Sequence, residues 1–429
     1  MRIALFTNTF TPHVGGVARS VEAFTRAYRA RGHDVLVVAP EFQDMPADEQ
    51  GVIRIPALQN FNGSDFSVVL ATPGSLPDQL ETFAPQVIHA HHPFLLGNVA
   101  ARVARTYELP LVLTHHTLYE QYTHYVPADS SLLRRFVIEL ATCYANMCDQ
   151  VFAPSESVAG LLEARGVEVP VAVVPTGVDF DRFSSGDGPR FRQTHGVPGD
   201  AFLVGHVGRL APEKNLGFLA AATVRFLQQR DDAWFLLVGQ GPSRDAVVER
   251  FDRDGLAGRL VTLGQLDHDA LRHAYAAMDV FAFASCTETQ GMVLTEAMSA
   301  GTPVVALEAS GVREVVDDGR NGRLIEHEDE DAFARGLRWV AERDADGRAA
   351  LRERAAATGR AYSMDRCADR ALAVYRQLLA ERGWRDKNPD RWARVANMIA
   401  AEWAIFSGGA QALSAAAIDQ LAEGDLEAD

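Results

Sequence analysis

Short runs of aliphatic residues alternate with amphipathic stretches along the first 180 residues. The aliphatic runs are predicted to be strands at 2–7, 34–39, 86–90, 111–114, 150–153 and 171–174. Helical patterns lie between them, at 17–31, 94–107 and 131–147. Continuous Val, Ile and Leu runs are typical of a parallel sheet that is covered on both faces. Their alternation with helices predicts right-handed βαβ units in a doubly wound α/β domain.

The pattern stops and then starts again. The segment at 181–200, DRFSSGDGPRFRQTHGVPGD, is rich in Gly, Pro, Ser and charge, which is typical of an interdomain connection. Further strands are predicted at 201–207, 234–238, 260–263, 280–284 and 303–306, with helices at 216–229, 243–254, 269–278 and 293–300. We therefore predict an N-terminal domain over 1–180, a linker over 181–200, a second α/β domain over 201–365, and helices over 366–429 that pack back on the first domain.

The C-terminal helical region carries an aromatic stripe. Its members recur at helical spacing: Trp384, Trp392, Met398, Trp403 and Phe406. Such a stripe is more often packed in a core or between domains than laid on a membrane, so packing is the expectation. A peripheral membrane role stays open, because residues 381–394 hold five basic and three acidic side chains. Residues 415–429 are Ala-rich and acidic, which predicts a frayed helix or a disordered tail.

Composition narrows the function classes. Of the 429 residues, 47% are hydrophobic and 23% charged, which is ordinary for a globular protein. The net charge of −16 argues against nucleic acid as the main partner. Four cysteines without a CxxC pair fit a reducing compartment, and neither a signal peptide nor a transmembrane run is evident. We expect a cytoplasmic protein, with attachment to the inner face of the cytoplasmic membrane left open.

In open parallel sheets ligands bind where strands end, so the segments after each predicted strand are the candidates for chemistry. Gly15 and Gly16 follow the first strand and precede a helix, where backbone can approach a phosphate closely. A tight loop without a ligand is the alternative.

Histidines gather after two later strands of the first half. The segments at 88–97 and 114–125 read IHAHHPFLLG and THHTLYEQYTHY. Six histidines in these segments are candidates for hydrogen bonds to a hydroxyl-rich ligand: His89, His91, His92, His115, His116 and His124. Histidine is also a common metal ligand, but no carboxylate or thiolate partner stands at a familiar spacing, so no metal site is assigned.

Charged residues follow two strands of the second half. Arg209 and Lys214, in VGRLAPEKN, are suited to hold a diphosphate and to neutralise a leaving phosphate; two solvated surface cations are the alternative. The segment at 285–300, SCTETQGMVLTEAMSA, opens a helix. Its backbone N–H groups are available to a phosphate at Gln290, Gly291, Met292 and Val293. Glu288 and Glu296 are acceptors suited to paired sugar hydroxyls.

Together these segments resemble glycosyltransferase family 4, whose members have the GT-B fold of two Rossmann-like domains facing a cleft. The resemblance spans about residues 1–325 and is carried, in the family's order, by PHVGGV, THHT, PTGVDFDRF, GRLAPEKN and TETQGMVLTEAMSAGTPVV. The segments HAHHPFLLG and HHTLYEQYTHYVP further resemble the branch that transfers glucose to diacylglycerol. On this resemblance, six residues of this chain are candidates for contacts with the acceptor: His91, His92, His115, Tyr119, Tyr122 and Tyr125.

The resemblance implies a retaining transfer from a nucleotide-diphospho-sugar, with UDP-glucose as the first candidate donor. It also implies that the C-terminal domain holds the donor and that the N-terminal domain holds a lipid or small-molecule acceptor. No cofactor is required, and a divalent metal at most stimulates. Arg209 and Lys214 match the diphosphate-binding pair, Glu288 the acid near the donor sugar, and Glu296 the acid that holds the ribose. Gly16 matches the glycine packed against the diphosphate, and His116 the catalytic histidine, with His115 beside it as the alternative.

Three other functions remain in competition. The first keeps the donor site but uses a soluble acceptor such as a polyol, a sugar phosphate or a polysaccharide. It is favoured by the acidic first half, where residues 1–180 hold eleven Arg, no Lys and eighteen acidic residues, so that attraction to anionic lipid is weak. The others are a non-catalytic sugar-nucleotide-binding protein and a histidine-based metallohydrolase.

Overall fold

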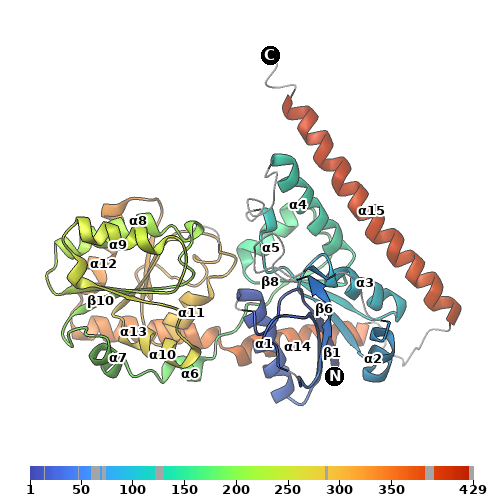
Figure 1. Ribbon diagram of the computed structural model, residues 1–429, viewed down its shortest axis with the longest axis horizontal. Coiled ribbons are helices and arrows are strands. Elements are labelled where there is room, and N and C mark those ends of the chain that lie inside the picture. The colour runs from blue at the N-terminus through green and yellow to red at the C-terminus, as the bar shows by residue number, and fades with distance from the viewer. Residues whose placement is uncertain are drawn as a thin grey trace. The chain divides into compact units, whose positions relative to one another are not determined.

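The computed structural model describes residues 1–13, 15–46, 48–58, 68–69, 74–120, 130–285, 288–381 and 391–424. The chain forms two compact units (Figure 1). Unit 1 comprises Met1–Pro175 and Cys367–Asp429, and unit 2 comprises Thr176–Arg366. The chain therefore enters unit 2 after Pro175 and returns to unit 1 after Arg366.

Unit 1 is built on a parallel sheet with the order β3-β2-β1-β6-β7-β8-β9. Its strands are β1 (Arg2–Phe6), β2 (Asp34–Pro40), β3 (Val52–Ile55), β6 (Val87–Ala90), β7 (Leu111–Thr114), β8 (Gln150–Ala153) and β9 (Val171–Val173). A short antiparallel pair joins β4 (Ala57–Leu58) to β5 (Val68–Val69). The strand order reverses between β1 and β6, and such a switch point opens a ligand site at the carboxyl edge of the sheet.

The sequence did not predict β3. This strand is only four residues long, contains Arg54, and alternates buried with half-buried positions at the edge of the sheet. The other strands of this sheet carry the continuous apolar runs that were expected. On one face of the sheet their side chains form a core with α2, α3, α4 and α5.

The helices of unit 1 are α1 (Gly16–Ala30), α2 (Leu76–Phe83), α3 (Leu96–Thr106), α4 (Ser131–Asn146), α5 (Glu156–Ala164), α15 (Arg391–Gly424) and most of α14 (Met364–Glu381). Serines fix the starts of two of them. The Ser130 hydroxyl accepts from the backbone N–H of Leu133, and that of Ser155 from Val158. Such caps satisfy N–H groups that a helix cannot pair internally.

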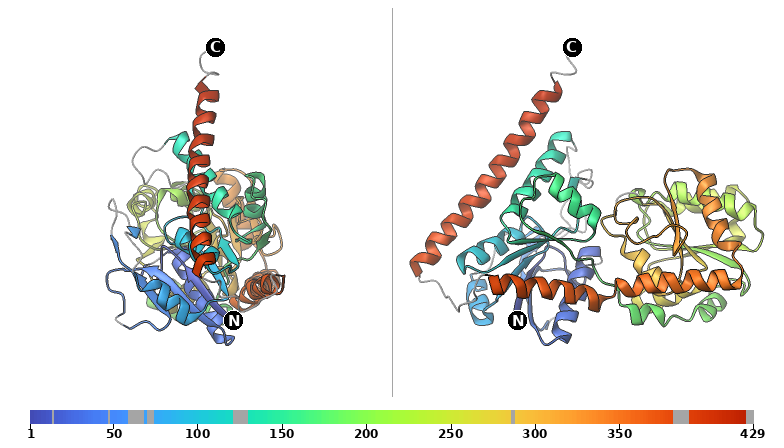
Figure 2. Two further views of the ribbon diagram at one scale, coloured as in Figure 1. Left: turned by 90° about the vertical axis from the view of Figure 1, so that its right-hand side faces the viewer. Right: turned by 180° about the vertical axis from the view of Figure 1, so that it is seen from behind.

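The long helix α15 lies along α3 and α4 (Figure 2). The expectation that its aromatic stripe would be packed in a core is wrong for the side chains that the structure describes. Met398, Trp403 and Phe406 are exposed, because the opposite face of the helix is the one that contacts α4. Trp384 lies outside the described residues, and the side chain of Trp392 is not among those described.

Unit 2 contains a second parallel sheet, with the order β12-β11-β10-β13-β14-β15 and a switch point between β10 and β13. Its strands are β10 (Phe202–Val207), β11 (Ala233–Val238), β12 (Leu260–Leu263), β13 (Val280–Phe283), β14 (Val304–Leu307) and β15 (Gly322–Ile325). The helices are α6 (Phe180–Ser184), α7 (Gly188–Thr194), η3 (Pro212–Lys214), α8 (Leu216–Gln228), α9 (Arg244–Arg253), η4 (Ala257–Arg259), α10 (His268–Ala277), α11 (Met292–Ser299), α12 (Glu330–Ala341) and α13 (Ala345–Ala361). Two parallel Rossmann-like sheets confirm the predicted fold class.

Residues 181–200 differ from the connection that their composition suggests, because they form most of α6 and all of α7 and pack on α10 inside unit 2. Two glycines of this segment permit that packing. A Cβ at Gly186 would lie 2.2 Å from the carbonyl oxygen of Arg272, and one at Gly188 would lie 2.4 Å from that of Ala276. The Gly-rich composition therefore reflects close helix packing rather than a free linker.

We predict that Gly97→Ala destabilises unit 1. A Cβ at this position of α3 would lie 1.9 Å from the carbonyl oxygen of His92, and overpacking of this kind costs about 1–3 kcal/mol. Urea unfolding measures the loss. The matched control is Gly160→Ala in α5. No described atom beyond the helix backbone and chain neighbours lies within 4 Å of a Cβ there, so the exchange should stabilise by about 0.5–1 kcal/mol. Equal effects at both sites would contradict the packing argument.

Candidate functional site

Unit 2 brings two predicted residues together at the carboxyl edge of its sheet. The ammonium of Lys214, in η3 after β10, forms an ion pair with Glu288, in the loop after β13. β10 and β13 are neighbours at the switch point, which is why residues 74 positions apart meet here. Both side chains are 19% exposed, so the pair is accessible yet partly desolvated.

Arg209 supplies a second cation at the same edge. Its guanidinium pairs with Glu213, which is largely buried, while the Arg209 side chain is 54% exposed. Ser285, after β13, donates to the carbonyl oxygen of Glu213 at 3.3 Å. The loops after β10 and β13 are thereby joined a second time.

The start of α11 leaves backbone donors available. Gly291 adopts φ 69° and ψ 59° as the residue before the helix, and no described side chain caps it. The backbone of Gly311 packs closely against this loop, since a Cβ at Gly311 would lie 2.7 Å from the backbone nitrogen of Gln290. The first turn of α11, with Met292 and Val293, therefore keeps N–H groups suited to an anion.

The side chain of Gln290 has a role that the sequence did not suggest. Its Oε1 accepts from the backbone N–H of Thr176, and its Nε2 donates to the Thr176 carbonyl, both at 2.7 Å. Thr176 is the first residue of unit 2. The loop before α11 is thus fastened to the point where the chain enters the unit.

Glu296 lies inside α11 and is 7% exposed. The hydroxyl of Tyr275, from α10, donates to its Oε2 at 2.7 Å. A carboxylate is rarely buried without a partner, and this hydrogen bond fixes its orientation. Sequence reasoning missed Tyr275, because nothing in its local pattern distinguishes it from a core tyrosine.

His206, near the end of β10, was also missed. Its ring is buried and stacks on Phe281 and Phe283, and Nδ1 lies 3.0 Å from the carbonyl oxygen of Ala282. Nδ1 must donate to that carbonyl, which leaves Nε2 as a buried acceptor with no partner among the described residues. Burial lowers the pKa of His206 to about 4, with Lys214 lowering and Glu288 raising it by smaller amounts.

In unit 1 a buried hydrogen-bond chain starts at His89 on β6. Its Nε2 lies 2.7 Å from the Thr114 hydroxyl, and its Nδ1 lies 2.6 Å from the hydroxyl of Tyr375 on α14. The Tyr375 hydroxyl is in turn 3.4 Å from that of Tyr28 on α1. Burial lowers the pKa of His89 to about 3, so the ring is neutral. The chain ties the returning helix α14 to the sheet.

The predicted catalytic His116 pairs with His91. Nδ1 of His91 lies 2.8 Å from Nε2 of His116, and the two rings stack. His91 also stacks on His89. Burial, followed by the neighbouring imidazoles, lowers the pKa of both His91 and His116. The pair is therefore neutral, and one ring donates to the other.

The remaining acceptor-side candidates lie in different surroundings. His92 accepts from the backbone N–H of Asn8 at 3.1 Å, and burial lowers its pKa to about 3. His115 packs against the edge of Tyr119, its two ring nitrogens have no partner among the described residues, and burial lowers its pKa to about 4. Tyr122, His124 and Tyr125 lie outside the described residues.

The glycines after β1 stand at the start of α1. Gly15 is extended and precedes the helix, and Gly16 is its first residue. No described atom beyond the helix backbone and chain neighbours lies within 4 Å of a Cβ built at Gly16. Packing within the described structure does not require this glycine, whereas a Cβ at Gly15 would lie 3.0 Å from Nε2 of His13.

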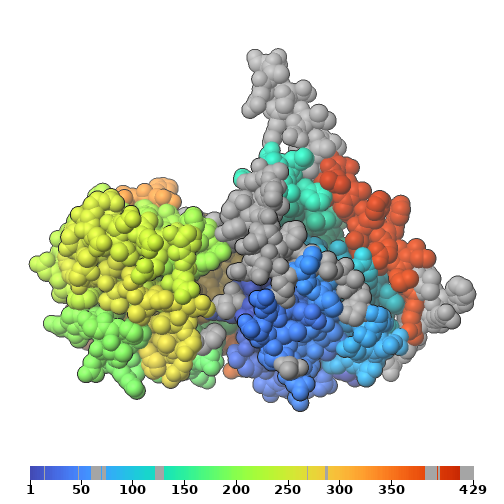
Figure 3. Space-filling model, viewed as in Figure 1, coloured from blue at the N-terminus to red at the C-terminus, as the bar shows by residue number. Residues whose placement is uncertain are grey.

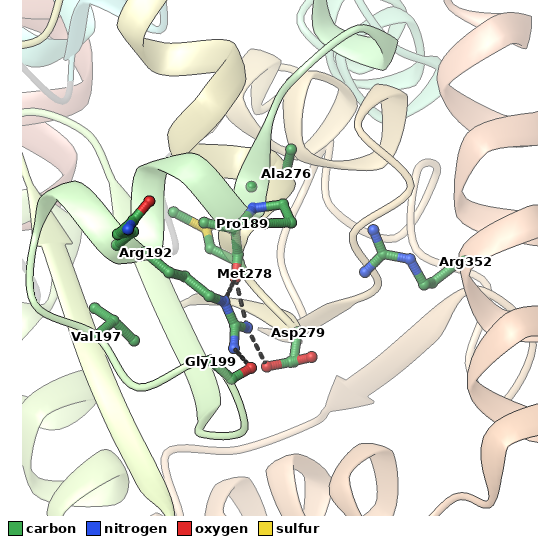
Figure 4. A pocket seen from close by; sticks show the side chains of 11 residues that line it. Pro189, Arg192, Val197, Gly199, Ala276, Met278, Asp279 and Arg352 are labelled. Carbon is green, nitrogen blue, oxygen red and sulfur yellow. Dashed lines mark hydrogen bonds and ion pairs between the residues drawn. The ribbon is translucent and has the colours of Figure 1, made fainter.

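A separate hollow of unit 2, with a volume of about 530 Å³, lies by the amino ends of β10 and β13 (Figure 4). Arg192 stands in it but donates to Ala277, to Ala201 and to Asp279. Its guanidinium is therefore structural, and the hollow lies away from the Lys214–Glu288 edge. Among the residues that the structure describes, no group of three His, Cys, Asp or Glu side chains is arranged to hold a metal ion.

Two family models match the chain. Residues 14–182 match the model described as Glycosyltransferase Family 4, and residues 187–360 match Glycosyl transferases group 1. The alpha-monoglucosyldiacylglycerol synthase of Acholeplasma laidlawii is 28% identical over 346 residues, which cover 77% of this chain and 86% of that protein. A GDP-mannose-dependent alpha-mannosyltransferase of Mycolicibacterium smegmatis is 32% identical over 338 residues, which cover 76% of this chain and 84% of that protein.

The fold also matches a solved structure. The Anabaena protein HepE, crystallised in complex with UDP, superposes with a TM-score of 0.69 at 23% identity, covering 88% of this chain and all of that one. At this identity the likeness supports the fold alone.

We predict that His206→Gln reduces the acid sensitivity of unit 2. The histidine is neutral when folded, with its pKa lowered to about 4 by burial, whereas it takes up a proton below about pH 6.5 when unfolded. His206 therefore does not reduce the free energy of unfolding above pH 6.5, and it reduces it increasingly as the pH falls toward 4. At pH 5 this one histidine lowers the free energy of unfolding by about 2 kcal/mol.

Urea unfolding of wild type and variant at pH 7.5 and pH 5 measures this difference. Because both proteins share all other titrating groups, the loss between the two pH values should be about 2 kcal/mol smaller in the variant. The exposed His327→Gln serves as control and should leave the difference unchanged. An identical pH dependence in wild type and His206→Gln would contradict the prediction.

Proposed function

We propose a reaction on the premise that this chain belongs to glycosyltransferase family 4 and has the GT-B fold. The protein transfers a hexose from a nucleotide-diphospho-sugar to a lipid with retention of configuration. Glucose from UDP-glucose and 1,2-diacylglycerol are the preferred substrates. The observation that carries the proposal is the Lys214–Glu288 ion pair beside the start of α11, which no described side chain caps.

The donor site follows from the charges at this edge. In the structure the two cations are paired with carboxylates, Arg209 with Glu213 and Lys214 with Glu288. A diphosphate takes over both cations and the N–H groups of α11, which releases Glu288 to accept hydrogen bonds from the sugar hydroxyls. Glu296, oriented by Tyr275, accepts from the ribose hydroxyls.

The same groups favour bond cleavage. As the bond between the sugar C1 and the phosphate oxygen breaks, negative charge grows on the leaving diphosphate. Fixed cations and helix N–H groups stabilise this charge more in the transition state than in the ground state. No metal is needed for that role, so a divalent ion is expected to stimulate at most.

Unit 1 supplies the acceptor side. His116, held by His91, is neutral and can orient the acceptor hydroxyl through a hydrogen bond. The acceptor oxygen attacks C1 on the face that the diphosphate leaves, and its proton passes to the leaving phosphate oxygen. The reaction forms one C–O bond, breaks another and keeps the configuration at C1.

A lipid acceptor is supported by the printed activity of the Acholeplasma relative and by the HHTLYEQYTHYVP segment. It implies that the protein works at the surface of the cytoplasmic membrane. The Mycolicibacterium relative uses GDP-mannose, so the donor is part of the test. The acidic first half favours the soluble-acceptor alternative.

We predict that Lys214→Ala lowers kcat by about 100-fold or more, because the removed cation acts on the developing charge. Hexosyl transfer by the purified variant measures the loss, and its thermal melting checks the fold. The matched control is Arg225→Ala, which removes a cation paired with Glu330 and Asp331 on the surface of the same unit. Near-wild-type transfer by Lys214→Ala would exclude the proposed donor site.

We predict diacylglycerol-dependent release of UDP from UDP-glucose in mixed micelles, retained in the presence of EDTA. Mass spectrometry should identify a hexosyl-diacylglycerol, and NMR of its anomeric proton should show the α configuration of the donor. GDP-mannose in place of UDP-glucose tests the donor. Tight UDP binding without stimulation by diacylglycerol would refute the lipid acceptor and favour a soluble one. Loss of all transfer with EDTA would refute the metal-independent mechanism.

A further inference from the structure

The outward face of α15 carries a continuous apolar stripe. Ile399, Trp403, Phe406 and Leu413 are 62, 70, 68 and 61% exposed. Their spacing of four, three and seven residues places them on one side of a helix. We call these four residues the outer stripe. Figure 3 shows described parts of α15 in red on the surface of unit 1.

The opposite face of α15 is anchored. Ala401 and Ala412 are buried, Ile405 packs against the unit 1 core, and a Cβ at Gly408 would lie 3.3 Å from that of Cys143 on α4. Small residues let the two helices approach closely. The helix therefore cannot turn to bury the outer stripe without losing this packing.

Ion pairs fasten the same helix at its edges. Glu402 pairs with Arg102 on α3, and Arg394 pairs with Glu81 on α2 at 2.6 Å. Between residues 395 and 418 Glu402 is the one charged residue in the sequence. Apart from Glu402, which is paired with Arg102, the positions around the outer stripe are uncharged.

We propose that the outer stripe docks unit 1 on a lipid surface. A rigidly held helix that exposes Trp and Phe along one uncharged side is suited to lie in the interface between headgroups and acyl chains. None of the helices among the described residues combines the length and hydrophobicity of a membrane span. Because α15 lies beyond residues 14–182 and 187–360, this surface is an addition to the matched family core.

A second copy of the chain fits the stripe less well. An aromatic side chain covers about 150–250 Å², so these four partly exposed side chains offer on the order of 500 Å². Each partner of a stable complex contributes about 800 Å². Apart from Glu402, which is already paired with Arg102, the positions beside the stripe also lack the charges that fix partner and register in helix pairs.

The proposal rests on the proposed function, because a membrane presents the lipid acceptor. The experiment measures vesicle binding and hexosyl transfer separately. The full chain is sedimented with phosphatidylcholine vesicles that contain diacylglycerol. Wild type should bind. The double variant Trp403→Ser/Phe406→Ser should bind at least about tenfold more weakly, because each substitution removes a large apolar contact with the lipid. Raising NaCl from 0.1 to 0.5 M should change wild-type binding less than about twofold, because the stripe is uncharged.

Leu58→Ser is the matched control, since Leu58 is an exposed apolar residue of unit 1 outside α15. It should bind vesicles as wild type does. Transfer to a short-chain diacylglycerol in micelles should be equal in all three proteins, while transfer to vesicle-borne diacylglycerol should fall only in the double variant. Equal vesicle binding by wild type and the double variant would overturn the proposal.

Two further results would overturn it. One is wild-type binding that disappears at high salt, which would assign attachment to charge. The other is a wild-type dimer in analytical ultracentrifugation that the double variant dissociates, which would assign the stripe to self-association. If the wild type transfers to no acceptor, the proposed function fails, yet vesicle binding still decides the role of the stripe.

Discussion

The ion pair between Lys214 and Glu288 depends on the geometry of a parallel sheet. All strands of such a sheet end at one edge, and at the switch point between β10 and β13 the loops diverge on either side. Such a divergence is where ligands bind in open parallel sheets, and here the loop ends stay within ion-pair distance. The accessible cations, the uncapped start of α11 and the buried Glu296 all follow from this one arrangement.

Burial sets the chemistry of unit 1. Imidazoles that would carry partial charge in water are held neutral in the cluster of His89, His91 and His116, because desolvation penalises the protonated form. Neutral rings both donate and accept hydrogen bonds, which suits them to position a hydroxyl group rather than to neutralise a phosphate. The two units thus offer complementary chemistry, with cations in one and neutral polar groups in the other.

The returning chain completes unit 1 in two ways. α14 brings the hydroxyl of Tyr375 to His89 and so supports the histidine cluster from outside residues 14–182, which match the family model. α15 then covers α3 and α4 with its small-residue face and leaves its aromatic residues outside. The C-terminal helices α14 and α15 therefore support the histidine cluster and add an apolar surface to a fold that is shared with other transferases.

The sequence alone determined the two α/β units, because continuous apolar runs and helical periods are local properties of the chain. It also located Lys214, Glu288 and Glu296, since the segments that follow parallel strands are where ligands bind; their roles stay predictions. Only the tertiary structure supplied Tyr275, His206 and Tyr375 as partners, because a buried polar group is defined by neighbours far away in the chain. For the same reason it reversed the interpretation of the α15 stripe: periodicity shows that a helix has an apolar face, but only packing decides which face is covered.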